Sequence, residues 1–165
     1  MKELLKKLIA EGWDSLPPYT PRGLSPQDLA AGSSSLALIG PRRAGKSYTA
    51  YEIKDKYLQK EERKRDFIYL NFEDERLADF KREHFDLIME AYHEMRPAKP
   101  LLVLDEIHQV DGWEKYARRL ADGGHKVVVT GSNSKMLSRE IAQSLGARFV
   151  EIEVYPLDFA EFIRF

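Results

Sequence analysis

The fold of this chain is set by one stretch, Leu36-Ala37-Leu38-Ile39-Gly40-Pro41-Arg42-Arg43-Ala44-Gly45-Lys46-Ser47. Its last eight residues match the Walker A pattern G-x-x-x-x-G-K-[ST], and the four residues before them form an apolar run. A buried strand that leads into a glycine-rich loop and then a helix directs backbone N–H groups and the helix dipole at a bound phosphate. The stretch therefore predicts a site for a nucleoside triphosphate.

Each position of this loop has a predicted task. The glycines permit positive φ and let the backbone approach the phosphates, Lys46 reaches the β- and γ-phosphates, and the Ser47 hydroxyl ligates Mg²⁺. In the alternative reading, the glycines serve only a strand-to-helix turn and Lys46 is a solvated helix residue. We expect the whole loop and the residue after it to contact the nucleotide, namely Gly40, Pro41, Arg42, Arg43, Ala44, Gly45, Lys46, Ser47 and Tyr48.

Composition narrows the class of protein. The 165 residues fit one domain, and a formal charge of -1 gives no general attraction to nucleic acid or to an anionic membrane. The absence of cysteine removes disulfides and cysteine-bound metals, and it fits a reducing cytoplasm. No stretch approaches the roughly 18 apolar residues that a membrane span needs. We expect a soluble cytoplasmic protein with no membrane association.

Two segments differ in character along the chain. Residues 1–35 predict an amphipathic helix followed by an arm rich in Pro, Gly and Ser, which can lie across the nucleotide base. From residue 36 to residue 165, apolar strands alternate with helical periodicity, which predicts an α/β core around a mainly parallel five-stranded sheet. The expected strands are Leu36–Ile39, Phe67–Asn71, Leu101–Asp105, Lys126–Thr130 and Phe149–Val154, and the expected helices are Lys46–Lys60, Leu77–Arg96, Gly112–Ala121 and Lys135–Leu145.

A second motif follows in the third strand, where Leu101-Leu102-Val103-Leu104 ends in Asp105-Glu106. We expect this buried strand to run beside the P-loop strand and to present Asp105 to Mg²⁺ through water, opposite Ser47. Glu106 can then accept a proton from an attacking water. Taken alone, the two carboxylates favour an ordinary polar strand end. Together with the P-loop they predict hydrolysis.

Polar residues follow the fourth strand in Gly131-Ser132-Asn133-Ser134. Asn133 or Ser132 can orient the lytic water there, although either serine can instead cap the next helix. Asn71, at the end of the second strand, can hydrogen-bond Glu106 or simply form a turn.

Arginines offer a further catalytic contribution. Arg148, just before the last strand, can reach the phosphate of a neighbouring subunit, or form an ion pair within its own chain. Other candidates for a phosphate or carboxylate contact are Arg42, Arg43 and Arg22.

Several motifs together resemble one group, the archaeal and bacterial AAA-type ATPases whose domain opens with Gly-Pro-Arg-Arg-x-Gly-Lys. The resemblance covers about residues 36–165. It rests on Gly40–Lys46, Tyr69–Leu77, Leu104–Ile107, Gly112–Glu114, Thr130–Ser134 and Tyr155–Phe162.

This resemblance implies a three-layer α-β-α P-loop fold with sheet order 5-1-4-3-2, ATP and Mg²⁺ as cofactors, and Glu106 as catalytic base. Two positions depart from the group, because Ala147-Arg148 replaces Gly-Arg and Pro156-Leu157-Asp158-Phe159 replaces Pro-Leu-Ser-Phe. Full-length members continue past this last motif, so we expect residues 36–165 to be an ATPase core that lacks the C-terminal lid and further domain.

The expected activity is Mg²⁺-dependent ATP hydrolysis, with Lys46, Glu106, Asn133 and Arg148 as catalytic residues and Ser47 and Asp105 on the metal. The alternative is a nucleotide-gated binding module with little or no turnover. The nucleotide is the expected partner, and homo-oligomer formation is compatible with the role given to Arg148. The sequence does not choose between a protein and a nucleic acid as a further partner.

Overall fold

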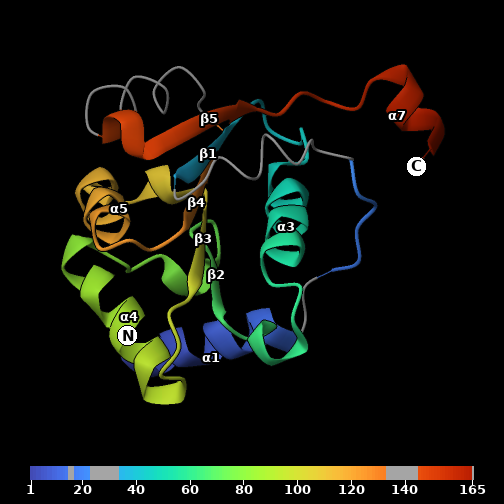
Figure 1. The fold of residues 1–165 in the computed structure, drawn as a ribbon. Helices are drawn as coiled ribbons and strands as arrows, with labels where there is room; N and C mark the ends of the chain where they lie inside the picture. Colours follow the sequence, from blue (N-terminus) through green and yellow to red (C-terminus); the bar gives the residue numbers. More distant parts are fainter. Residues whose placement is uncertain (15–16, 23–33, 133–144, 165) are drawn as a thin grey trace.

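The computed structural model describes residues 1–14, 17–22, 34–132 and 145–164. Its centre is a sheet of five parallel strands in the order β2-β3-β4-β1-β5 (Figure 1). This is the predicted order 5-1-4-3-2 read from the other edge. The strands are β1 (Ser35–Ile39), β2 (Phe67–Asn71), β3 (Leu101–Asp105), β4 (Val127–Gly131) and β5 (Phe149–Glu153).

Helices cover both faces of the sheet, as the three-layer prediction requires (Figure 1). Side chains alternate along each strand, so Leu36 and Leu38 of β1 pack with Ile53 of α3 (Lys46–Tyr57), whereas Ala37 and Ile39 face the opposite layer. That layer holds α4 (Phe85–Met95) and α5 (Trp113–Asp122). Both faces of β1, β3 and β4 are buried, which explains their uninterrupted apolar sequences.

The N-terminal helix α1 (Lys2–Asp14) is amphipathic, as predicted, and packs against α4 and β2. Its buried stripe includes Leu5, Leu8 and Ile9, which join the same apolar cluster as α4 and α5. The Trp13 indole donates a hydrogen bond to the Phe67 carbonyl of β2 at 2.8 Å. The helix is therefore an integral part of the hydrophobic core. Within the described part of the chain, no helix is both long enough and apolar enough to cross a membrane.

The chain after β5 runs along the P-loop and ends in the short helix α7 (Phe159–Arg164), which extends from the body of the domain (Figure 1). Val154 donates its N–H to the Ile39 carbonyl at 2.7 Å. This contact fixes the exit from β5 against the end of β1.

The predicted helix Leu77–Arg96 is wrong at its beginning. Two 3-10 turns, Glu75–Leu77 and Arg82–His84, precede α4, which begins only at Phe85. The Asp74 carboxylate accepts the Arg76 N–H, and the His84 ring accepts the Lys81 N–H at 3.0 Å. The His84 ring takes the Lys81 N–H, which a continuous helix would have used, so the apolar periodicity continues while the helix does not.

Other boundaries need smaller corrections. The first core helix ends at Tyr57, three residues before the predicted Lys60, and the strands agree with their predicted limits to within one residue. The strand β3 does not run beside β1, because β4 lies between them. The predicted helix Lys135–Leu145 falls, apart from Leu145, outside the described residues.

Candidate nucleotide site

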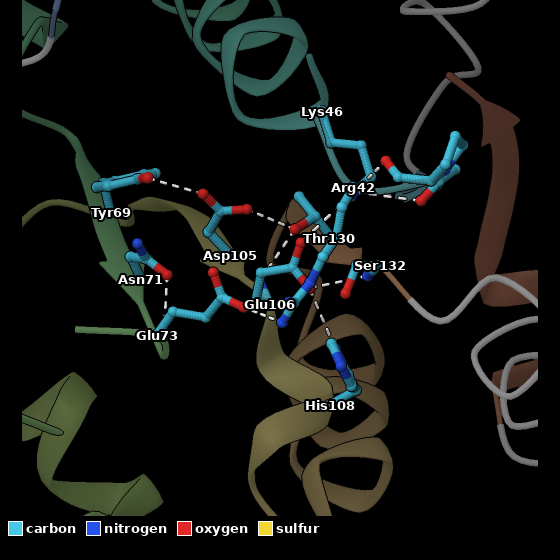
Figure 2. A network of polar contacts seen from close by, with 12 residues as sticks. Arg42, Lys46, Tyr69, Asn71, Glu73, Asp105, Glu106, His108, Thr130 and Ser132 are labelled. Atoms are coloured by element: carbon cyan, nitrogen blue, oxygen red, sulfur yellow. Dashed lines mark hydrogen bonds and ion pairs between the residues drawn. The ribbon is translucent and has the colours of Figure 1, made fainter. Parts of the chain in front are cut away.

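A pocket of about 530 Å³ opens at the carboxyl end of the sheet. Parallel strands bring their carboxyl ends to one edge, where side chains that are far apart in sequence meet. The residues that line this pocket are Arg42, Arg43, Gly45, Lys46, Ser47, Tyr48, Asn71, Glu73, Asp105 and Glu106. Eight of the ten are residues that the sequence predicted for nucleotide, metal or catalysis, and Figure 2 shows the polar contacts among several of them.

The P-loop owes its shape to residues with unusual backbone conformations. Gly45 and Arg43 both lie in the left-handed region, with φ of 92° and 64°. Gly40 serves a different purpose, because a Cβ at this position would lie 2.1 Å from the Val154 carbonyl oxygen. The first glycine of the motif is therefore required for packing the chain after β5, in addition to any approach to phosphate.

Lys46 begins α3, and its side chain curls back into the loop. Its ammonium group donates to the Gly40 and Pro41 carbonyls at 3.2 and 3.1 Å, and it lies 3.5 Å from the Glu106 carboxylate. Only 5% of the side chain is exposed. The positive charge is thus held at the position where a helix N-terminus and a P-loop bind phosphate.

Asp105 ends β3 and is almost completely buried. The Tyr69 hydroxyl donates to its Oδ2 at 2.7 Å, and the Thr130 hydroxyl donates to its Oδ1 (Figure 2). Burial, together with the neighbouring Asp105 charge, raises the pKa of Tyr69 and keeps this hydroxyl a donor. Asp105 and Ser47 supply one carboxylate and one hydroxyl to a shared pocket, which fits Mg²⁺, an ion that takes few protein oxygens and completes its shell with water and phosphate.

Glu106 follows immediately and adopts φ of 51°, which is uncommon for a residue with a side chain. Its N–H donates to the Thr130 hydroxyl at 2.9 Å, which stabilises this turn of the backbone. Its carboxylate accepts the Ser132 N–H at 2.8 Å and lies 3.4 Å from the His108 ring. The left-handed turn directs the carboxylate toward Lys46 and the end of β4 (Figure 2).

Asn71 takes the turn-forming role that the sequence left open. Its carboxamide oxygen accepts the Glu73 N–H at 2.9 Å, and Glu73 in turn pairs with Arg42 of the P-loop at 3.1 Å. The contacts to the Glu106 carboxylate come instead from Ser132 after β4, from the P-loop lysine and from the His108 ring.

Asn133 and Arg148 are the two remaining residues that the sequence predicted to be catalytic. Asn133 is outside the described residues. Arg148 forms an ion pair with Asp122 of its own chain, at the end of α5, which is the second of the two readings that the sequence allowed. Its proposed action on a neighbouring subunit stays a prediction.

A second pocket of about 580 Å³ adjoins the first and shares Arg43, Gly45 and Tyr48 with it. The rest of its lining comes from the arm, from the P-loop and from the segment after β5, namely Pro18, Tyr19, Thr20, Arg22, Ala44 and Leu157. The Arg22 guanidinium donates to the carbonyls of Ala44 and Tyr155 and pairs with Glu161 of α7. Arg22 therefore holds the arm, the P-loop and the C-terminal segment together.

Sequence reasoning missed Tyr69, Thr130 and His108. Thr130 carried a weak signal, since it ends the predicted fourth strand. Tyr69 begins one of the motifs of the resemblance, but no role could be given to it, because its contact with Asp105 depends on the register in which Asn71 of β2 pairs with Asp105 of β3. Such a register is a property of the assembled sheet.

The parallel sheet, the glycine-rich loop between β1 and α3, and the carboxylates at the end of β3 define a P-loop nucleoside triphosphatase fold. The AAA domain family matches residues 33–163, and the chain belongs to that family. It is thus an AAA-type P-loop ATPase domain.

Similar proteins include two curated relatives and a solved structure. An uncharacterized protein of Methanocaldococcus jannaschii is 42% identical over 128 residues, which are 78% of this chain and 28% of that protein. An uncharacterized protein of Haemophilus influenzae is 35% identical over 129 residues, which are 77% of this chain and 32% of that protein. The chain therefore spans less than a third of the length of these relatives. The structure of C. elegans PCH-2 aligns with a TM-score of 0.48 at 12% identity, over 96% of this chain and 42% of that one.

Proposed function

We propose that this chain binds Mg²⁺ and ATP and hydrolyses ATP to ADP and phosphate. The observation that carries the proposal is one pocket lined by Lys46, Ser47, Asp105 and Glu106. A cation for phosphate, two oxygen ligands for a metal and a carboxylate base are the parts that phosphoryl transfer to water requires.

The residues have separate tasks in this mechanism. Lys46 exchanges its contact with Glu106 for the β- and γ-phosphates, which frees one carboxylate oxygen. Glu106 then accepts a proton from a water aligned with the γ-phosphorus, and the bond from that phosphorus to the β,γ-bridging oxygen breaks. Ser47 and Asp105 would hold Mg²⁺, and the bound ion would supply charge neutralisation on the phosphate oxygens. Asn133 is the proposed residue for orienting the water.

The second pocket is the proposed site of the adenosine part of the nucleotide. It adjoins the phosphate pocket through Arg43, Gly45 and Tyr48, and it is lined by the rings of Tyr19 and Tyr48. Aromatic rings stack on any nucleobase, so this pocket supports the binding of a nucleoside. The choice of adenine rests on the family resemblance.

Wider features of the proposal rest on the motifs shared with the GPRRxGK group. They are an ATPase core at residues 36–165 and assembly into a homo-oligomer in which Arg148 reaches a neighbour. The ion pair of Arg148 with Asp122 would have to open for that contact. A cytoplasmic location is proposed from the absence of cysteine.

The test measures phosphate release and binding of a fluorescent ATP analogue by wild type, Lys46→Ala and Glu106→Gln. Lys46→Ala is expected to weaken nucleotide binding by about 100-fold, because it removes the charge that contacts phosphate. Glu106→Gln is expected to keep binding and to lower phosphate release by about 100-fold or more. Lys115→Ala, an exposed lysine on α5, is the matched control and should behave as wild type.

A nucleotide-gated module is the second candidate. It is favoured by the contacts that Glu106 makes with Lys46, Ser132 and His108, since a carboxylate engaged in this way is not free to activate water. Equal and negligible phosphate release by wild type and Glu106→Gln, with analogue binding retained in both, would establish this module and exclude the ATPase.

A further inference from the structure

The Tyr69 hydroxyl lies between two other oxygen atoms in the interior of the domain. It is 2.7 Å from Asp105 Oδ2 and 3.0 Å from the Tyr51 hydroxyl. Tyr69 comes from β2 and Tyr51 from α3, so the three side chains link the P-loop helix to the end of β3 across the sheet. None of the proposed chemical steps uses either tyrosine.

The direction of these hydrogen bonds follows from the groups involved. An ionised Asp105 carboxylate only accepts, so the Tyr69 proton must point toward it. The remaining lone pairs of Tyr69 then accept the proton of Tyr51, and this order agrees with the donor directions in the structure.

Ring packing holds this pair in place. The Tyr51 ring meets the Tyr69 ring edge to face at a centroid distance of 5.3 Å, and it meets the Tyr48 ring in the same way at 5.7 Å. Tyr19 of the arm lies on another side, with centroids 6.4 Å apart. Tyr19 and Tyr48 line the second pocket, so a row of tyrosines connects that pocket with Asp105.

The two oxygens of Asp105 are therefore fixed from different sides. Thr130 of β4 donates to Oδ1, and Tyr69 of β2 donates to Oδ2. A carboxylate with a single hydrogen-bond donor can rotate about its Cβ–Cγ bond. Two donors, one on each of the strands that flank β3, define the plane of the carboxylate. The lone pairs that remain are then the ones available to the pocket that Asp105 lines with Ser47.

We propose that Tyr69, supported by Tyr51, is a positioning residue that orients Asp105 for Mg²⁺ and thereby sets the metal dependence of nucleotide binding. The inference rests on the proposed nucleotide function. Groups that hydrogen-bond a metal-binding carboxylate typically change metal affinity by about 10- to 100-fold. Tyr69→Phe removes one hydroxyl and keeps the ring contacts, so it is the sharpest change that the chain offers.

The experiment titrates Mg²⁺ into a fixed concentration of a fluorescent ATP analogue and also measures analogue binding in the presence of EDTA. Tyr69→Phe is expected to raise the half-saturating Mg²⁺ concentration by about tenfold while leaving binding in EDTA unchanged. Tyr51→Phe keeps the hydrogen bond from Tyr69 to Asp105 and should give a smaller increase in the same direction. Asp105→Asn gives the reference for loss of the metal carboxylate.

Tyr116→Phe is the matched control. Tyr116 is another buried tyrosine, and among the described residues its hydroxyl has no hydrogen-bond partner. This variant should reproduce the wild-type titration. Thermal midpoints of all variants report whether any change reflects a loss of folding.

The outcomes separate the two proposals. A wild type whose analogue binding does not respond to Mg²⁺ contradicts the proposed function. A wild type that responds, together with a folded Tyr69→Phe that has the same Mg²⁺ dependence, overturns the positioning role. Equal weakening of binding with Mg²⁺ and in EDTA also overturns it, because that pattern indicates general damage to the site. Should Tyr69→Phe not fold, a Tyr51→Phe titration identical to wild type overturns the proposal instead.

Discussion

Two regions of this domain are built on opposite principles. The layer between the sheet and helices α1, α4 and α5 is filled with apolar side chains in ordinary conformations, such as Ile88 and Trp113. The carboxyl end of the sheet buries Asp105 and Lys46, and it holds Arg43 and Glu106 in left-handed conformations. Buried charges and positive φ each cost free energy unless their surroundings compensate for them. The comparison shows that the apolar layer provides stability, whereas the polar end is arranged for binding at some cost to it.

Of the changes that test this comparison, a cavity in the apolar layer is expected to have the largest effect on stability. Ile88 of α4 has no solvent exposure, and Ile88→Ala should lower the free energy of unfolding by about 2–5 kcal/mol. Nucleotide affinity should not change at temperatures where the variant is folded. Chemical denaturation gives the stability, and the fluorescent analogue gives the affinity.

An exposed position on the same helix is the control. His93→Ala should change stability by less than about 0.5 kcal/mol. If Ile88→Ala weakens nucleotide binding while its stability is unaffected, the assignment of stability to the apolar layer and of binding to the polar end is wrong.

A smaller effect is expected from removing one hydroxyl at the polar end. Thr130→Val keeps the shape of the side chain but leaves the Glu106 N–H without its acceptor and Asp105 Oδ1 without its donor. Unsatisfied buried groups of this kind cost about 1–3 kcal/mol. Because both proposed functional carboxylates lose support, phosphate release should also fall by about tenfold.

Thr130→Ser is the matched control for the hydroxyl, since it removes only the methyl group. It should retain phosphate release close to wild type. If serine and valine lower the rate equally, then packing of the methyl group matters and the hydrogen bonds do not.

The smallest effect is expected at the surface, where Glu94 of α4 pairs with Lys2 and Lys6 of α1. The hydrogen bond from Lys2, followed by that from Lys6, lowers the pKa of Glu94 from 4.5 to about 2. A carboxyl group with a depressed folded-state pKa stabilises the fold above its unfolded pKa. That contribution is lost as the pH falls from about 4.5 toward 2.

The measurement compares thermal midpoints of wild type and Glu94→Gln at pH 7 and at pH 3. The small difference at pH 7 should shrink at pH 3, and it should also shrink in high salt because the pair is exposed. Glu83→Gln, which removes an exposed carboxylate near the start of α4, should follow wild type at both pH values. A Glu94→Gln difference that is independent of pH would contradict this account.

Most of the sheet could be predicted because β1, β2, β3 and β4 are short, largely apolar runs with clear ends. The beginning of α4 could not be predicted, because the helical spacing of apolar residues already starts in the two 3-10 turns that precede the helix. Asp74 and His84 accept hydrogen bonds from the backbone of these turns, and α4 begins only after them. Sheet order came from the resemblance to a family. The expectation that β3 lies beside β1 was wrong because β4, which comes later in the chain, inserts between them and pairs with both.

For the site, the sequence by itself determined the residues whose placement depends on local geometry. Lys46 and Ser47 begin a helix after a tight loop, and Asp105 and Glu106 end a strand, so short-range structure is enough to bring them to the carboxyl end of the sheet. Tertiary structure alone decided what holds them there. The contacts of Tyr69, Thr130 and His108 depend on strand register and on a left-handed turn at Glu106. The same is true of Gly40, whose missing side chain makes room for the backbone after β5. Those relations join segments far apart in the chain, and only the packed sheet fixes the distances between them.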